Sequence, residues 1–312
     1  MGASMKAIST IVATIALGST AFFADRASAA SLEPPGWTAG VALGAPLPQG
    51  TYFIDTATAG GWRGVDDNKS SLGINVPLLA WSSPWTVLGD GRVEVLAAAP
   101  EISGGVPALA GSPTWAGRDY TALYNPVGFV GAAWNLGNGF GFSAFIGGWA
   151  PVDNQLAQFG FDSWVLSERL NLSYTANDWK LSANLSFGQP GNSQVHTVFY
   201  PAGATGQILP DYVNYDLTAT KTIGKWEVGL VAFGSSDTSK AAWNSLASHL
   251  FKATPYGEQS QFAAGALVGY TFPGVILQTY LTRDLVSNNY YNLSDGSKSY
   301  ETRIWTRAII PL

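Results

Sequence analysis

The fold is decided by a stretch at residues 177–188, which reads NDWKLSANLSFG. Apolar and polar residues alternate in it, with Trp179, Leu181, Ala183, Leu185 and Phe187 set between Lys180, Ser182, Asn184 and Ser186. A β-strand sends successive side chains to opposite faces, so this segment has one apolar face and one polar face. Nearly every strand-like segment of the chain shares this pattern. The question is what the apolar faces contact.

The composition narrows the answer to two environments. The 312 residues include 36 Gly, 12 Trp, 13 Tyr and 15 Phe, and only 12% are charged, whereas ordinary domains carry about 25% charged residues. A folded chain of this kind exposes its apolar area either to lipid or to the core of a large sandwich. The absence of Cys excludes a disulfide-stapled fold, thiol catalysis and cysteine metal sites. No basic tract indicates nucleic acid, and the net charge of −5 is too small to define a partner.

The first 30 residues have the pattern of a secretory signal peptide. A short basic region ends at Lys6, an apolar region spans residues 7–24, and small residues offer cleavage after Ala29 or Ala30. We expect the chain to be exported. No later run of 18 or more apolar residues predicts a membrane-spanning helix.

Beyond residue 50, twelve segments have strand character, several of them long enough for a tilted membrane strand of roughly 9–11 residues. They lie near residues 50–59, 70–80, 92–100, 127–136, 139–150, 161–175, 178–188, 211–223, 225–235, 260–272, 275–284 and 299–312. Before them, residues 31–49 are rich in Pro and Gly and predict no regular element. That segment either enters the lumen of the fold as a plug or stays loose in the periplasm.

The connections between these segments alternate in length. Short, turn-forming sequences are NLGNGFG, TAND, TIGKW and FPG. The connections between them are long (101–126, 151–160, 189–210, 236–259 and 285–298), and 60–69 and 81–91 are intermediate. A sandwich has no reason to sort its loops in this way, whereas an outer-membrane barrel has turns at one rim and loops at the other.

The sequence therefore predicts an all-β fold: a transmembrane antiparallel β-barrel of about 12 strands at residues 50–312, with short periplasmic turns and long extracellular loops. The apolar face of NDWKLSANLSFG then contacts outer-membrane lipid, and its polar face lines a lumen, where Ser182 and Asn184 are expected to be accessible to water. Aromatic residues beside the short turns, such as Trp179, Trp226 and Tyr270, predict an interfacial girdle. In the 236–259 loop, KAAWNSLASHLFKA has the spacing of a short amphipathic helix, although a surface-packed loop fits equally well.

Four runs of the sequence resemble the outer-membrane family named for the meta-pathway of phenol degradation. They are WNLGNGFGFSAFIGGWAPV, LNLSYTANDWKLSANLSFG, VNYDLTATKTIGKWEVGLVAFG and AAGALVGYTFPGVILQTYLTRDL, and the arrangement strand, IGKW, strand is the most specific feature. The resemblance covers roughly residues 45–312. It implies a barrel related to fatty-acid channels and linked to the catabolism of aromatic or other hydrophobic compounds. It carries no catalytic motif.

Catalysis or metal binding has little support in the residues present. Both histidines, His196 and His249, fall in long loops, so neither a zinc site nor a serine hydrolase site on the barrel wall is indicated. We therefore expect no enzyme activity, no metal and no cofactor.

Alternation along the strands predicts which side chains face the lumen. The charged ones are Arg92, Glu94, Arg169, Asp216, Glu227, Asp284, Glu301, Arg303 and Arg307, and the aromatic ones include Phe145, Trp149, Phe233 and Trp305. These charges either pair to stiffen the wall or shape a selective passage. Glu168 falls on the lipid side, so it lies near a rim or the register is shifted there.

The leading interpretation is an outer-membrane channel for passive uptake of small hydrophobic compounds, with aromatic ones favoured. Its expected partners are outer-membrane lipid, these solutes and the barrel-assembly machinery. The alternative is a structural or adhesive outer-membrane barrel with a blocked lumen. An outer-membrane enzyme is disfavoured because neither His lies on a strand.

Overall fold

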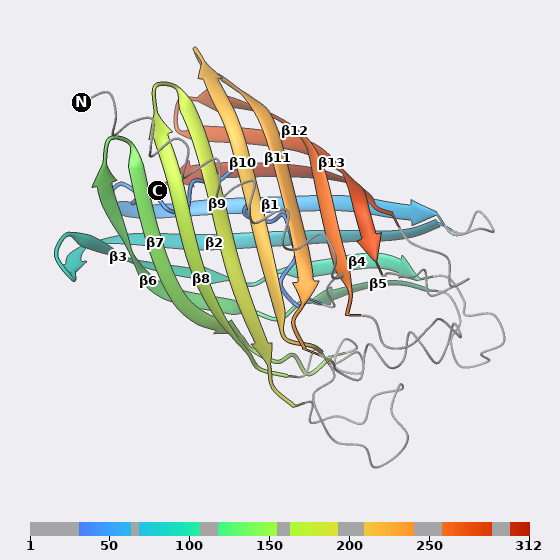
Figure 1. Cartoon of the computed structure of the whole chain (residues 1–312). Helices are drawn as coiled ribbons and strands as arrows, with labels where there is room; N and C mark the ends of the chain where they lie inside the picture. The colour runs from blue at the N-terminus through green and yellow to red at the C-terminus, as the bar shows by residue number, and fades with distance from the viewer. Residues whose placement is uncertain are drawn as a thin grey trace.

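The computed structural model describes residues 31–63, 69–106, 118–154, 163–192, 209–239, 258–288 and 300–312. The signal peptide at 1–30 and the helix or loop at 240–253 lie outside these residues. The regular structure of the described residues is antiparallel β-sheet (Figure 1), and no helix among them is long and apolar enough to cross a membrane. The strands are β1 (Gly50–Arg63), β2 (Lys69–Val87), β3 (Gly91–Ala98), β4 (Glu101–Val106), β5 (Arg118–Leu123), β6 (Val127–Gly137), β7 (Phe140–Trp149), β8 (Val165–Ala176), β9 (Trp179–Pro190), β10 (Tyr212–Ile223), β11 (Trp226–Asp237), β12 (Ser260–Phe272), β13 (Val275–Asn288) and β14 (Thr302–Pro311).

The sheet closes on itself. Strand β1 pairs with β14 on one side and with β2 on the other, and each remaining neighbour is antiparallel. Strands β3 and β4 are successive parts of one long strand, because both pair with β2. Strands β5 and β6 form the next long strand, because β5 pairs with β4 and β6 pairs with β3. The result is a closed 12-stranded barrel. The predicted fold class and strand number are confirmed.

The two interrupted strands break at prolines. Pro100 separates β3 from β4, and Pro126 precedes β6. Proline has no N–H to donate, but its carbonyl still accepts a hydrogen bond. Tyr124 N donates to Pro100 O at 2.8 Å, and Ala150 N donates to Pro126 O at 2.8 Å, so contact between neighbouring strands continues across both breaks.

Two predicted connections are wrong in part. The 101–126 segment contains β4 and β5, which extend the wall beyond the breaks. Strand β2 continues to Val87, so the connection predicted at 81–91 shrinks to the three residues Leu88, Gly89 and Asp90. With that change, short and long connections alternate around the whole barrel.

The short connections gather at one end of the barrel, here called the short-turn rim. They are residues 88–90, 138–139, 177–178, 224–225 and 273–274. The turn between β8 and β9 places Asn177 and Asp178 at φ 54° and 63°. A two-residue hairpin turn with positive φ at both positions matches the twist of its strands, which explains why TAND forms a tight turn. The opposite end is called the long-loop rim.

The outer surface is apolar in the alternating pattern that the sequence predicts. Leu230 and Leu281 are 66% and 57% exposed in mid-strand. Near the short-turn rim, Trp226 and Tyr270 pack with ring centroids 4.8 Å apart, as in an interfacial girdle. Glu168 is exposed opposite Phe187 three residues after β8 begins, so the register is unshifted and Glu168 lies near the long-loop rim.

Candidate functional site in the barrel interior

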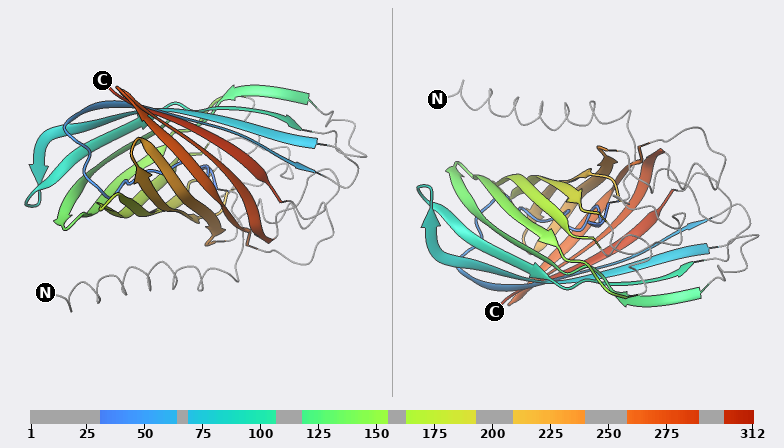
Figure 2. Two further views of the ribbon diagram at one scale, coloured as in Figure 1. Left: turned by 90° about the horizontal axis from the view of Figure 1, so that it is seen from above. Right: turned by 90° about the horizontal axis from the view of Figure 1, so that it is seen from below.

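Residues 31–49, here called the lumenal segment, run through the interior of the barrel (Figure 2). They form only turns, bends and irregular backbone, so their peptide groups need partners other than a helix or sheet. Inward side chains of the strands supply those partners. The polar faces of the strands therefore surround a piece of the same chain.

A carboxylate on β10 binds one turn of this segment through its backbone N–H groups. Asp216 Oδ1 accepts from Gly36 N at 2.8 Å, and Oδ2 accepts from Thr38 N at 2.9 Å and Thr38 Oγ1 at 2.5 Å. Gly36 has φ 94°, and a Cβ there would lie 2.6 Å from the Phe233 ring, so both the backbone conformation and the close packing require glycine.

A guanidinium on β14 binds the carbonyl side of the same turn. Arg307 donates to Trp37 O at 2.5 Å and to Ala39 O at 2.6 Å. Its other hydrogen bonds go to Thr56 Oγ1 at 2.9 Å, to Gln278 and to Tyr280. Asp216 and Arg307 thus hold the turn from its N–H groups and from its C=O groups.

Further along, neutral side chains of β7 to β13 satisfy the backbone of the segment. These bonds are Tyr280 Oη to Gly36 O at 2.8 Å, Asn184 Nδ2 to Thr38 O at 3.2 Å, Gly40 N to Thr218 Oγ1 at 2.7 Å, Gln278 Nε2 to Gly40 O at 3.1 Å, Ser182 Oγ to Val41 O at 3.1 Å, Ser143 Oγ to Leu43 O at 2.7 Å and Gly44 N to Ser173 Oγ at 3.0 Å. Ser182 and Asn184 are consequently buried, and the expectation that water reaches them in an open lumen is wrong.

The beginning of the segment is anchored by an ion pair. Arg169 donates to Glu33 Oε1, and both side chains are only 2% exposed. Trp37 Nε1 donates to the same oxygen at 2.7 Å, and Ser186 Oγ donates to Glu33 Oε2 at 2.5 Å. The Arg169 guanidinium also lies 4.7 Å from the centre of the Trp37 ring. A desolvated charge is stable only when it is paired and hydrogen-bonded in this way.

The remaining predicted charges fall into two groups. Glu227 binds Lys180 Nζ at 2.8 Å, and Glu301 pairs with Arg303, so these contacts lie within the wall. Asp284 likewise binds wall groups, accepting from Glu301 N at 2.6 Å and Gln261 Nε2 at 2.9 Å.

Two charges lie on β3. Glu94 accepts from Leu47 N at 2.8 Å and so contacts the end of the lumenal segment. Arg92 is half-buried one residue from the start of β3, near the short-turn rim.

The four predicted inward aromatic residues are all buried. Phe233 packs on Trp305 with ring centroids 5.9 Å apart. Trp149 packs on Trp37 of the lumenal segment at 6.0 Å. Phe145 is buried on β7, opposite Arg169 of β8. None of these four side chains lines the cavity between the lumenal segment and strands β1 to β3.

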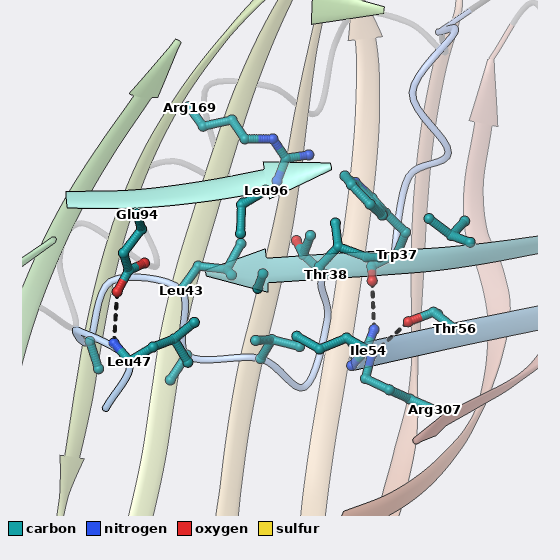
Figure 3. Close-up of a pocket in the computed structure, with 16 residues that line it drawn as sticks. Trp37, Thr38, Leu43, Leu47, Ile54, Thr56, Glu94, Leu96, Arg169 and Arg307 are labelled. Atoms are coloured by element: carbon teal, nitrogen blue, oxygen red, sulfur yellow. Dashed lines mark hydrogen bonds between the residues drawn. The ribbon is translucent and has the colours of Figure 1, made fainter. Parts of the chain in front are cut away.

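A cavity of about 50 Å³ separates the lumenal segment from one side of the wall (Figure 3). The segment contributes Trp37, Thr38, Val41, Ala42, Leu43, Ala45 and Leu47; the wall contributes Ile54, Thr56, Val76, Leu78, Ala80, Glu94, Leu96, Arg169 and Arg307. Most of these side chains are apolar. Figure 3 shows the Glu94–Leu47 bond at one end of the cavity and Arg307, bonded to the segment, at the other.

The interior is therefore divided by polarity. Strands β8 to β10 and β13 to β14 turn Ser, Asn, Thr, Gln and charged side chains toward the segment. Strands β1 to β3 turn mainly Ile54, Val76, Leu78, Ala80 and Leu96 inward.

Several of these groups escaped the sequence reasoning. Glu33 lies outside any strand, so alternation says nothing about it. Gln278 and Tyr280 lie on inward faces that alternation does identify, so the alternation of those strands carries the signal for them. Among the described residues, no group of three or more His, Cys, Asp or Glu is placed to hold a metal ion. His196 and His249 lie outside the described residues.

A solved outer membrane channel shares this fold. The crystal structure of the COG4313 outer membrane channel from Pseudomonas putida F1 has a TM-score of 0.59 and 11% sequence identity, covering 86% of this chain and 98% of that one. The Pseudomonas putida toluene transporter TodX has a TM-score of 0.46 and 10% identity, covering 90% and 95%. A Pseudomonas aeruginosa FadL homologue has a TM-score of 0.47 and 8% identity, covering 89% and 99%. At 11% identity, the likeness to the COG4313 channel is one of fold.

No curated protein matches the sequence. The sequence pattern of the family described as "Putative MetA-pathway of phenol degradation" matches residues 54–297, which is most of the chain and nearly all of its barrel, and the protein belongs to that family.

Proposed function

We propose that the protein is an outer-membrane channel for passive uptake of small hydrophobic compounds, with aromatic ones as the favoured class. The observation that carries this proposal is the apolar cavity between the lumenal segment and strands β1 to β3. Its lining offers an apolar solute favourable burial, and ligand sites in proteins are commonly apolar pockets with a few polar groups. The phenol-degradation family supports the same solute class, and the likeness to the COG4313 outer membrane channel supports a channel.

This interior offers a polar solute few free hydrogen-bonding groups. A sugar gives up hydrogen bonds to water when it enters and needs replacements from the wall. Many inward polar groups of β8 to β14 are already engaged, either with the lumenal segment, as Asp216 and Arg307 are, or with other wall groups, as Asp284 is. The segment therefore acts as a plug against hydrated solutes, and the short-turn rim faces the periplasm.

The size of the cavity sets a condition on transport. Its volume of about 50 Å³ is smaller than the roughly 150 Å³ of an engineered cavity that binds benzene. A phenol-sized solute consequently passes only when lining side chains or the segment move.

Uptake by proteoliposomes tests the proposal. Vesicles with purified protein are expected to take up a phenol-like compound faster than protein-free vesicles, and to take up a sugar of similar size no faster than the protein-free control. Because small aromatics also cross bilayers unaided, the measured quantity is the difference between the two kinds of vesicle. Equal acceleration of both solutes would contradict an apolar channel.

The second candidate is a structural or adhesive barrel whose lumen stays blocked. The dense bonding of the lumenal segment to the wall favours it. It predicts no acceleration of any solute and no conductance in planar bilayers.

As for any barrel of this class, the barrel-assembly machinery is the proposed partner for insertion, and no enzyme activity is proposed.

A further inference from the structure

We propose that the lumenal segment stays in place during transport as a fixed part of the channel wall, and that solutes pass between it and the apolar face of β1 to β3. This inference rests on the proposed function and specifies the route. It assigns solute contact to Ile54, Val76, Leu78, Ala80 and Leu96, which form the wall of that route.

The hydrogen bonds of the segment lie mainly on one side. Between Gly36 and Gly44, the bonds to strands go to side chains of β7, β8, β9, β10, β13 and β14. Among the residues that the structure describes, bonds to β1, β2 and β3 come at the end of the segment, where Leu47 meets Glu94 and Ser82 and Pro48 O accepts from Tyr52. The segment is attached to the polar wall and lies loosely against the apolar one.

Releasing the segment would disturb buried charges. Asp216 would lose three donors, and Arg307 would lose two carbonyl acceptors at 2.5 and 2.6 Å. Every acceptor that the structure gives Arg307 is neutral, so the guanidinium has no carboxylate bond to retain after release. Leaving a buried charged group without its partners is among the costliest local changes.

Moving aside the apolar contacts costs far less. Leu43 and Val41 line the cavity together with side chains of β2 and β3. Apolar packing at such a lining is non-directional, and an apolar solute replaces it with equivalent contacts. Rotamer changes of such side chains are fast compared with rearrangement of a bonded backbone segment. The route of least disruption therefore follows the cavity, past Leu47 near the short-turn rim.

A disulfide between the segment and the polar wall tests this route. The natural sequence has no Cys, so a double variant T38C/N184C contains only the designed pair. The Thr38 Oγ1 and Asn184 Nδ2 atoms lie 3.3 Å apart, and the bond formed would tie the segment to β9. Completeness of oxidation is checked by counting free thiols.

Uptake of the phenol-like compound is measured in proteoliposomes carrying the oxidised and then the reduced variant. The fixed-wall route predicts no loss of uptake on oxidation. Uptake that stops on oxidation and returns on reduction would overturn it, because the segment must then move away. If the unmodified protein accelerates no uptake, the proposed function itself fails; if it does and the disulfide abolishes uptake, only the route fails.

A pair of filling variants tests the other side of the route. Ala80 on β2 lines the cavity, whereas Ala263 on β12 is inward and equally buried but lies away from it. Ala80→Phe is expected to lose most of the uptake, and Ala263→Phe to retain it, with barrel assembly checked by gel mobility. Retention by Ala80→Phe would overturn the route. If either variant fails to assemble, the disulfide experiment decides alone.

Discussion

At the residue scale, Asp216 shows why a carboxylate is needed in the interior. Its two oxygens receive Gly36 N, Thr38 N and Thr38 Oγ1, so both oxygens act as acceptors. An asparagine there presents one acceptor and one donor, and the donor faces an N–H group. Losing one hydrogen bond to a charged group costs about 1.5–3 kcal/mol.

Asp216→Asn is therefore expected to loosen the lumenal segment, raising the population of the released turn by roughly tenfold or more, since about 1.4 kcal/mol is a factor of ten. A nitroxide at Ala42→Cys reports this as a more mobile electron paramagnetic resonance spectrum. Asp284→Asn is the matched control, because Asp284 is also a buried carboxylate but binds wall groups at Glu301 and Gln261. Equal mobility in both variants would show that Asp216 does not hold the lumenal segment more strongly than Asp284 does.

The sequence predicts the strand residue of such a contact but not its partner in the lumenal segment. Alternation places Asp216 and Arg307 on inward faces, and in the structure both side chains are buried and bonded to the lumenal segment. Their partner is a turn about 180 residues away from Asp216 in the chain, and the Pro- and Gly-rich composition of 31–49 contains no periodicity that would dock it. The location of a segment without regular structure depends on tertiary contacts, and those cannot be deduced from local pattern.

At the scale of the element, period-2 alternation predicts the faces of the strands well, because hydrocarbon and lumen impose opposite demands on each strand. Two strands escaped prediction. Strand β4 contains Gly104 and Gly105 and follows Pro100, and β5 is short, so both look like loop in isolation. They become strands by pairing with each other, and β4 also pairs with the long strand β2.

The outer face provides an element-scale prediction. Leu281 lies near the middle of β13 and is 57% exposed, so Leu281→Arg is expected to cost about 2–4 kcal/mol of folding free energy in a bilayer. Glu168→Arg, close to the long-loop rim, is expected to cost about 0–1 kcal/mol. Denaturant unfolding in lipid vesicles measures both. Equal costs would mean that the face of β13 contacts no hydrocarbon.

At the scale of the whole molecule, closure determines how the barrel unfolds. Because β1 pairs with both β2 and β14, the ring that closes through β3 and β6 has no end strand from which to fray, and β5, which extends beyond this ring, pairs with β4. We expect the unboiled protein in detergent to migrate differently from the boiled protein on a gel. Identical migration after every mild treatment would argue against a closed barrel.

The inward polar side chains of the barrel are covered by the lumenal segment and not by water. Asn184 and Lys180 share the inward face of β9, but Asn184 lies under the segment at 4% exposure, whereas the Lys180 side chain near the short-turn rim is 26% exposed. The most direct measurement is the rate at which a small water-soluble thiol reagent modifies Asn184→Cys and Lys180→Cys in the folded barrel. The structure predicts rapid modification at position 180 and strong protection at position 184, with protection lost on unfolding. Equal, rapid modification of both in the folded barrel would contradict it, because the lumen would then be open water.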